Sequence, residues 1–321
     1  MAFPRPRIRP SPTVLLTTGL LLLGLLGSCR PSSDAAPNAA QDRPAAPSLP
    51  DSALTPPDSA TAARFAAAMR YGRAQADSVQ SVGALMQALG HHFRGRPYLE
   101  GTLDTGSTET LVVRLDGFDC VTFIETTLAL ARGIIAEDTT YAGFARRLAE
   151  QRYRDGTLQG YCSRLHYFTE WLADNEQKGI VDRIDDDLGG RRMTDTLDFM
   201  STHRSSYDRF ATTDSLYACV QSMEDSLQAQ QQARPVRYVP QDSIRAVYDR
   251  LRAGDIVGVA TSIDGLDISH TGLVYAHDNG KKGFLHASLS DGVVVSPDLQ
   301  RYIQKIDHQI GIVIARPQPV E

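Results

Sequence analysis

The sequence FDCVTFIETTLALA, residues 118–131, predicts a helix with a cysteine at its first position. Asp119 is a residue type that favours the N-cap, the position just before a helix begins. The apolar residues that follow recur at helical spacing and share one face: Val121, Ile124, Leu128 and Ala131. We therefore expect a helix that begins at Cys120 and buries this face in the protein core.

On either side of this helix the hydrophobic pattern changes from helical to strand-like. The segments 77–93 and 140–232 show mainly helical spacing. From residue 255 onward, short apolar or alternating runs predict about five strands: 255–260, 269–275, 283–287, 293–295 and 310–314. Because helices come first and strands last, we expect an α+β fold. Its helical N-terminal half packs on an antiparallel sheet, with a helical insertion at about 135–240.

The expected position of Cys120 suits a nucleophile. Unpaired backbone N–H groups and the helix dipole favour a negative charge at a helix N-terminus, so they favour a thiolate there. The N–H of Cys120 could also stabilise an oxyanion. The alternative is a buried structural cysteine, which is the usual role of a lone cysteine.

Two histidines favour the catalytic interpretation. His270 and His286 lie on consecutive predicted strands joined by a hairpin turn at residues 278–280, so they can be neighbours across the sheet. In such a pair one imidazole can accept the thiol proton while the other orients it.

Five motifs in this order resemble the NlpC-type papain-like cysteine peptidases. They are GRPY at 95–98, DC at 119–120, AGDIV at 253–257, SHTGLV at 269–274 and LHAS at 285–288. The stretch FDCVTFIE at 118–125, together with SRLHY at 163–167, is more similar to one branch, the N-acetylmuramoyl-L-alanine amidase-like proteins. The resemblance implies a papain-like fold with the cysteine helix packed on the sheet.

The resemblance also implies roles for individual residues. Cys120 would be the nucleophile, His270 the general base and His286 the residue that orients it. Tyr98 would face the site and help to hold the oxyanion or the substrate. Asp119 is a further candidate for substrate binding.

Two residues of the insertion are also candidates for substrate binding. Arg164 could pair with a substrate carboxylate, although a structural ion pair is an equal alternative. Tyr167 could stack on a sugar, although its helical spacing also fits a core position.

The reaction implied by the resemblance is hydrolysis of the amide between N-acetylmuramic acid and L-alanine through a cysteine thioester. Many NlpC-type endopeptidases have Ser-Gly after the Asp-Cys pair, where this chain has Val121-Thr122. That difference favours the amidase over a γ-D-glutamyl endopeptidase, which stays an alternative. A metal-dependent amidase using His270, His277 and His286 and an inactive peptidoglycan-binding lipoprotein are further alternatives. We expect peptidoglycan or muropeptides as partners, and neither a metal nor an organic cofactor.

The N-terminal residues predict export. A positively charged start and the apolar run 14–26 precede Cys29, as in a secretory signal peptide. The sequence LGSC at 26–29 resembles the lipobox of bacterial lipoproteins, which implies a signal peptide at 1–28 and a lipid on Cys29. Residues 29–60 have the composition of a disordered tether, and 61–321 are long enough for one catalytic domain. We therefore expect a lipid-anchored protein of the cell envelope.

Charge and cysteine content add two constraints. The formal net charge is −5 with both signs interspersed, whereas a nucleic-acid-binding protein calls for a basic patch. Besides Cys29, the chain has three cysteines, so at least one thiol is free in an oxidising compartment. A disulfide between Cys162 and Cys219 would leave Cys120 unpaired.

Overall fold

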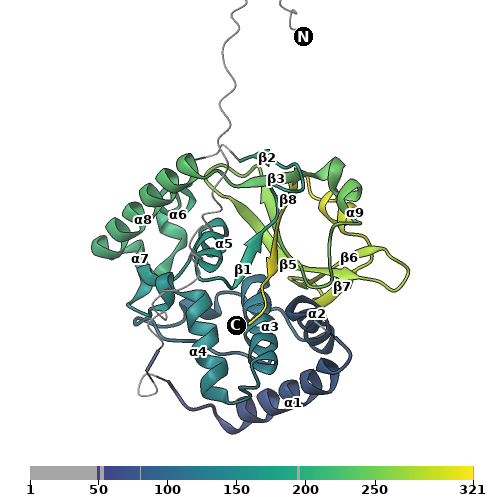
Figure 1. Cartoon of the computed structure of the whole chain (residues 1–321). Helices are drawn as coiled ribbons and strands as arrows, with labels where there is room; N and C mark the ends of the chain where they lie inside the picture. The colour runs from purple at the N-terminus through teal and green to yellow at the C-terminus, as the bar shows by residue number, and fades with distance from the viewer. Residues whose placement is uncertain (1–48, 51–53, 80, 194–195, 321) are drawn as a thin grey trace, which may run out of the picture. The chain divides into compact units, whose positions relative to one another are not determined.

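A computed structural model describes residues 49–50, 54–79, 81–193 and 196–320 (Figure 1). The predicted signal peptide and Cys29 lie outside the described residues. The sequence predicts that the catalytic domain begins at residue 61. Packing against this domain begins earlier, because Leu49 packs against Ala149 and Tyr153. None of the helices in these ranges is long and apolar enough to cross a membrane.

Four helices form the N-terminal layer. They are α1 (Ser59–Ala76), α2 (Val82–His92), α3 (Cys120–Ile135) and α4 (Tyr141–Arg152). Each begins after a residue whose side chain accepts a backbone N–H of the first turn: Asp58, Ser81, Asp119 and Thr140. Such caps satisfy amides that have no partner within the helix. The helix predicted from Cys120 is confirmed.

The sheet is antiparallel and has eight strands, against the five or so that were predicted. Its order is β2-β3-β8-β4-β5-β6-β7, and β1 pairs with β8. Five strands match the prediction: β4 (Ile256–Thr261), β5 (Ile268–Ala276), β6 (Lys282–Ser288), β7 (Gly292–Ser296) and β8 (Gln309–Pro317). The three additional strands are short and come from the insertion: β1 (Val181–Arg183), β2 (Arg191–Arg192) and β3 (Arg237–Pro240).

The sheet buries both of its faces because its strands have apolar residues on both sides. Leu273 of β5 and Leu285 of β6 are register partners on the face that shares a core with α2 and α3. Val274 and Phe284, the next pair, belong to the core of the opposite face. The 3-10 helix η6 (Gln241–Val247) and α9 (Leu299–Ile303) contribute residues to that second core. In Figure 1 α9 lies beside β6 and β7, on the opposite side of the molecule from α8.

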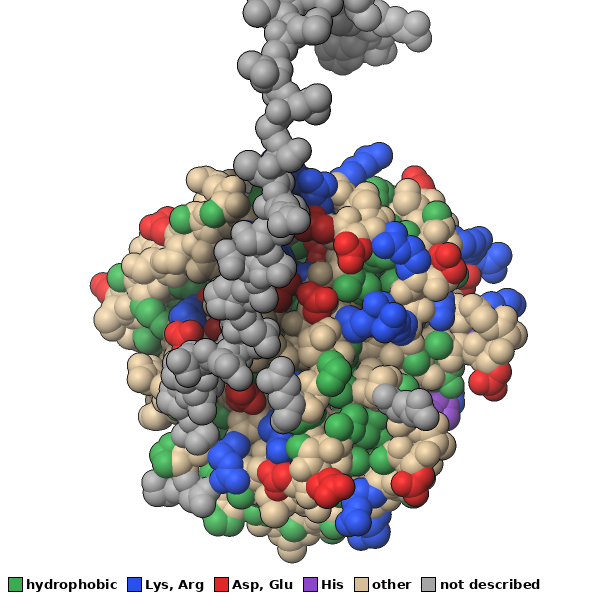
Figure 2. Space-filling model, in the orientation of Figure 1, with side chains coloured by type: hydrophobic (Ala, Val, Ile, Leu, Met, Phe, Trp, Pro, Cys, Tyr) green, Lys and Arg blue, Asp and Glu red, His purple; other side chains and the backbone are tan. Residues whose placement is uncertain are grey.

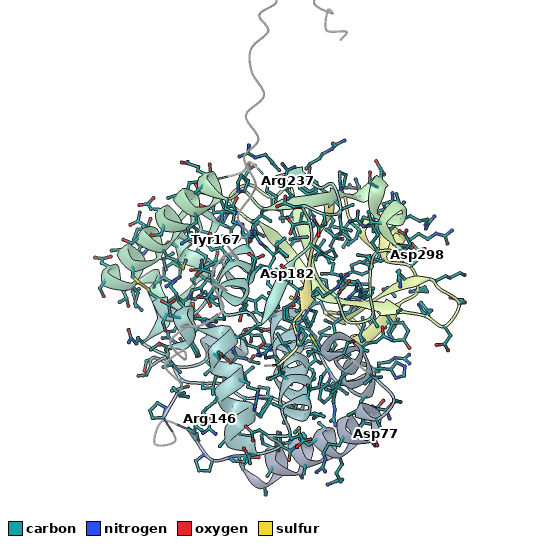
Figure 3. The ribbon with its side chains drawn as sticks, viewed as in Figure 1. Asp77, Arg146, Tyr167, Asp182, Arg237 and Asp298 are labelled. Atoms are coloured by element: carbon teal, nitrogen blue, oxygen red, sulfur yellow. A yellow bond between two sulfur atoms is a disulfide. The ribbon has the colours of Figure 1, made fainter. Side chains whose placement is uncertain are left out.

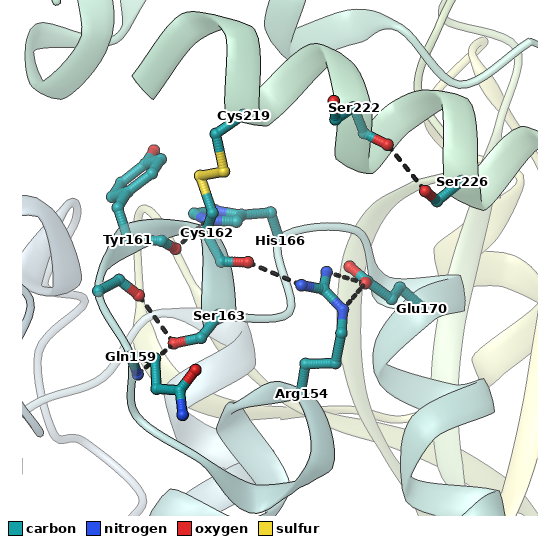
Figure 4. The surroundings of a disulfide bond; sticks show 11 residues. Arg154, Gln159, Tyr161, Cys162, Ser163, His166, Glu170, Cys219, Ser222 and Ser226 are labelled. Atoms are coloured by element: carbon teal, nitrogen blue, oxygen red, sulfur yellow. Dashed lines mark hydrogen bonds and ion pairs between the residues drawn. A yellow bond between two sulfur atoms is a disulfide. The ribbon is translucent and has the colours of Figure 1, made fainter. Parts of the chain in front are cut away.

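The insertion builds a small core of its own. It contains α5 (Phe168–Gln177), α6 (Phe199–Thr202), α7 (Asp208–Ala211) and α8 (Asp214–Ala233). It also contains three short 3-10 segments: η3 (Arg154–Gly156), η4 (Tyr161–Ser163) and η5 (Arg204–Ser206). A further 3-10 segment, η2 (Thr102–Asp104), precedes α3. A disulfide joins Cys162 of η4 to Cys219 of α8, as the cysteine count allowed (Figure 4).

A buried carboxylate fixes α3 against its neighbours. Glu125 of α3 pairs with Arg152 of α4 at 2.7 Å, and both side chains are almost fully buried. The indole N–H of Trp171, on α5, donates to the same carboxylate at 3.3 Å. Because breaking a buried pair leaves an uncompensated charge, this contact holds the helix that carries Cys120 in one position.

Candidate active site

Cys120 is the first residue of α3, and a capping box fixes the helix start. The Thr122 N–H donates to Asp119 Oδ1 at 2.7 Å, and the Asp119 N–H donates to Thr122 Oγ1 at 3.0 Å. The Asp119 carboxylate is therefore engaged with its own helix. Its described contacts position Cys120; the substrate-binding role considered for Asp119 stays a prediction.

Cys120 is the free cysteine of the described chain, and the residue is partly exposed. Burial of the thiol, followed by the negative charge of Asp119, raises the pKa of Cys120 to about 11. The hydroxyl and backbone of Thr271, on β5, interact with the sulfur and oppose this rise. The lowered thiol pKa expected from the helix N-terminus is thus not found, because desolvation of the charged form outweighs the helix dipole.

The two histidines meet as predicted. His270 Nε2 and His286 Nδ1 are 2.8 Å apart, and the rings are nearly perpendicular, with centroids 4.9 Å apart. Burial lowers the pKa of His270 to about 4 and, with the neighbouring His270, that of His286 to about 3. Both imidazoles are therefore neutral near pH 7. The Ser296 hydroxyl lies 3.5 Å from the second nitrogen of His286.

Two tyrosines complete this group of side chains. Tyr98 forms a β-bridge with Phe118, and burial together with the charges of Cys120 and Asp119 raises the pKa of its hydroxyl. Tyr302, on α9, has its ring centroid 4.7 Å from that of His286. Burial and then the charge of Cys120 raise the pKa of Tyr302 to about 12. Both hydroxyls thus lie within electrostatic reach of Cys120.

The structure does not bring Arg164 to this group. Arg164 is 5% exposed and pairs with Asp104 and Glu109, and its guanidinium lies 5.0 Å from the centre of the Tyr161 ring. Two carboxylates therefore already neutralise it, and the geometry favours the structural ion pair of the two interpretations given above.

Tyr167 is also a core residue. It is 2% exposed and belongs to the core of the insertion (Figure 3). Its hydroxyl donates to Glu224 at 2.7 Å and accepts the Met200 N–H at 3.1 Å. A ring packed and hydrogen-bonded in this way has no free face for stacking on a sugar.

Within the described ranges, no group of three or more His, Cys, Asp or Glu side chains is placed to hold a metal ion. His277, considered with His270 and His286 for a metal-dependent reaction, instead packs edge-on against Tyr275 with centroids 4.8 Å apart. The groups of the candidate site that could take part in catalysis are therefore the Cys120 thiol and the two imidazoles of His270 and His286.

The fold and these side chains define an α+β protein of amidase-like architecture, and comparison with known proteins names its family. The chain belongs to the AmiA-like family, N-acetylmuramoyl-L-alanine amidase-like, whose model matches residues 88–312. A search of the curated proteins gives no match.

Solved structures of bacterial proteins share the fold. The crystal structure of an N-acetylmuramoyl-L-alanine amidase from Bacteroides uniformis has 28% sequence identity and a TM-score of 0.67. The alignment covers 73% of this chain and 97% of that one. A protein from Bacteroides fragilis, provisionally described as a xylanase, has 31% identity and a TM-score of 0.64, covering 71% and 98%. A protein from Legionella pneumophila, at 20% identity, a TM-score of 0.60 and coverage of 82% and 97%, shows the fold alone.

Proposed function

We propose that this protein is a cysteine hydrolase with a papain-like, NlpC-type arrangement. It cleaves the amide between the lactyl group of N-acetylmuramic acid and L-alanine in peptidoglycan or muropeptides. Two observations carry the proposal: the His270–His286 hydrogen bond, and a free thiol at a helix N-terminus that interacts with Thr271, the residue after His270. The family match supports the substrate class.

The proposed reaction proceeds by proton transfer and thioester formation. His270 donates its Nε2–H to His286 Nδ1, which leaves His270 Nδ1 free to accept the Cys120 proton. The sulfur attacks the lactyl carbonyl, and the C–N bond breaks as the imidazolium protonates the leaving amine. Water, deprotonated by His270, then hydrolyses the thioester and restores the thiol.

The hydroxyl of Tyr98 is a candidate oxyanion donor. Because burial raises its pKa, the phenol stays protonated across the neutral pH range. The backbone N–H of Cys120, at the first position of α3, is the second donor. Donors that belong to the folded protein would stabilise the developing charge without reorganisation.

The proposed chemistry distinguishes this chain from a glycoside hydrolase. Glycoside hydrolysis uses two carboxyl groups that flank the scissile bond. Here the carboxylate beside Cys120, that of Asp119, is engaged in the capping box of α3, and the other groups of the proposed site are imidazoles and phenols. The γ-D-glutamyl endopeptidase stays the alternative, because the same thiol and histidines could attack a different amide. Val121 favours the amidase, as argued from the sequence.

We also propose a lipid on Cys29 that anchors the protein to a membrane of the cell envelope. This proposal depends on the signal-like sequence that precedes Cys29. Incorporation of labelled fatty acid by the wild type, lost in Cys29→Ser, would support it. Equal labelling of the two proteins would contradict it.

The activity is tested on defined muropeptides with product analysis by mass spectrometry. We expect the wild type to release an intact stem peptide and a peptide-free muramic sugar, and Cys120→Ala to release neither. Shortened peptides that remain attached to the sugar would identify the endopeptidase. Turnover by Cys120→Ala equal to that of the wild type would refute cysteine catalysis.

A further inference from the structure

A cavity of about 890 Å³ lies between the β5–β6 hairpin, η6 and the segment that contains α9. Asp298, which caps α9, marks one wall in Figure 3. Asn279 and Gly280, at the tip of the hairpin, line the opposite wall. None of the functions argued above uses this cavity.

The cavity shares two side chains with the candidate active site. Tyr302 lines the cavity, and its ring contacts both His286 and His270, at centroid distances of 4.7 and 6.2 Å. Ser296 also lines it, and its hydroxyl lies 3.5 Å from His286 Nε2. A ligand in the cavity would therefore lie beside two residues that contact the histidine pair.

Positive charge predominates in the cavity. Its lining includes four exposed cations: Arg245, Lys281, Arg301 and Lys305. Asp298 is the acidic residue of the lining, and it pairs with Arg245 at 2.8 Å. The chain as a whole has a net charge of −5, so this surplus of cations is a local feature. Figure 2 shows Lys and Arg side chains gathered over α9 and beside the hairpin.

We infer that this cavity binds the carboxylates of the peptidoglycan stem peptide. The inference rests on the proposed function and adds a subsite to it. In the intact substrate the sugar side of the lactyl–alanine amide is uncharged, whereas the stem peptide carries several carboxylates. Because cations attract carboxylates and gain nothing from a neutral sugar, the cavity suits the peptide side of the scissile bond.

The orientation of the substrate follows from this assignment. The sugar and lactyl carbonyl lie on the side of Cys120 and Tyr98, and the stem peptide extends past Tyr302 into the cavity. The peptide is the leaving group in the proposed first step, so the cavity holds the first product. Strong retention of that peptide would slow the enzyme, and exposed cations provide the moderate, salt-sensitive attraction that such a site needs.

Binding of a free peptide to an inactive variant tests the inference separately from catalysis. The ligand is the tripeptide L-alanyl-γ-D-glutamyl-diaminopimelate, and Cys120→Ala is the host. We expect Arg301→Gln with Lys305→Gln to raise its Kd about tenfold in calorimetry, since two exposed charge pairs are lost. Arg70→Gln, an exposed cation on α1, is the matched control and should leave the Kd unchanged.

Further ligands separate recognition of the stem peptide from general attraction of anions. The same tripeptide with amidated carboxylates should bind weakly and be insensitive to Arg301→Gln with Lys305→Gln. Equal Kd values for the free and amidated peptides, or inorganic phosphate binding as tightly as the tripeptide, would overturn the inference. A failure of the proposed function would look different, because the wild type would then leave muropeptides intact whatever the Kd of the peptide.

Discussion

At the scale of single residues, cysteine hydrolases differ in which group carries the thiol proton before substrate binds. In this chain the two candidate groups are Cys120 and His270. A preformed thiolate–imidazolium pair requires a thiol pKa below that of the imidazole. Here the pKa of Cys120 is raised to about 11 and that of His270 is lowered to about 4, both mainly by burial. Both groups are therefore neutral at rest near pH 7, so in the proposed reaction the proton moves while the sulfur attacks.

Thiol alkylation measures this difference directly. Below a raised pKa the thiolate fraction increases tenfold per pH unit. We expect the rate of iodoacetamide labelling of Cys120 to rise roughly tenfold per unit between pH 7 and pH 9, without a plateau. Mass spectrometry of the labelled peptide provides the rates, with Cys120→Ala as the blank. A constant rate from pH 6 upward would mean that a thiolate already exists at rest.

Tyr302 is the residue of the site that the sequence does not reveal, and its hydroxyl can be tested alone. Tyr302→Phe keeps the ring packed on His286 but removes the hydroxyl that interacts with Cys120. We expect kcat on a muropeptide to fall about tenfold with KM little changed, as for loss of one hydrogen bond made in the transition state. Tyr141→Phe removes the hydroxyl of a residue on α4 whose ring packs on Phe65 and Phe144, and it is the control. Equal kcat values for the two variants would refute a role for the Tyr302 hydroxyl.

At the scale of elements, the buried contact between α3 and α4 controls where Cys120 lies. Arg152→Met leaves the Glu125 carboxylate buried without its partner, so we expect the free energy of unfolding to fall by about 3–5 kcal/mol. Urea denaturation measures this loss. Arg114→Met breaks an exposed pair with Asp116 and should cost less than about 1 kcal/mol. Similar losses in both variants would mean that the buried pair does not secure α3.

The elements that the sequence predicts are those specified by local patterns. The helix from Cys120 has its cap and its apolar face within one stretch, and the β5–β6 pairing follows from the hairpin at 278–280. By contrast, β1 and β3 have three and four residues, and each pairs with β8 from far along the chain. Strands this short do not show an alternation of apolar and polar residues that could be recognised in the sequence. They form because they pair with β8 in the folded protein.

The same distinction applies to side chains of the candidate site. His270 and His286 could be brought together from the sequence because strand register determines which side chains are neighbours. Arg164 and Tyr167 could not be placed, because their partners Asp104 and Glu224 lie 60 and 57 residues away. Tyr302 reaches the histidines only through the packing of α9 on the sheet, for which no sequence motif exists.

At the scale of the whole molecule, the buried histidines link stability to pH. The pKa of His270 is lowered to about 4 and that of His286 to about 3, against about 6.5 in an unfolded chain. Between pH 6.5 and pH 4 the unfolded state therefore binds more protons than the native state. Stability contributed by these groups is fully present above pH 6.5 and is lost as the pH falls. Buried carboxylates with raised pKa values, such as Glu125 and Asp267, act in the opposite direction.

Because of these opposing groups, the histidine contribution has to be measured as a difference. We expect the free energy of unfolding of the wild type to lose up to about 1.4 kcal/mol per pH unit for each buried histidine as the pH falls from 6.5 to 5. The variant His270→Gln with His286→Gln lacks these groups, so its stability should fall less steeply over the same range. His308→Gln removes an exposed histidine just before β8 and is the control. Urea denaturation at several pH values gives the slopes. If the double variant and the wild type lose stability in parallel, burial does not lower the pKa values of the two imidazoles.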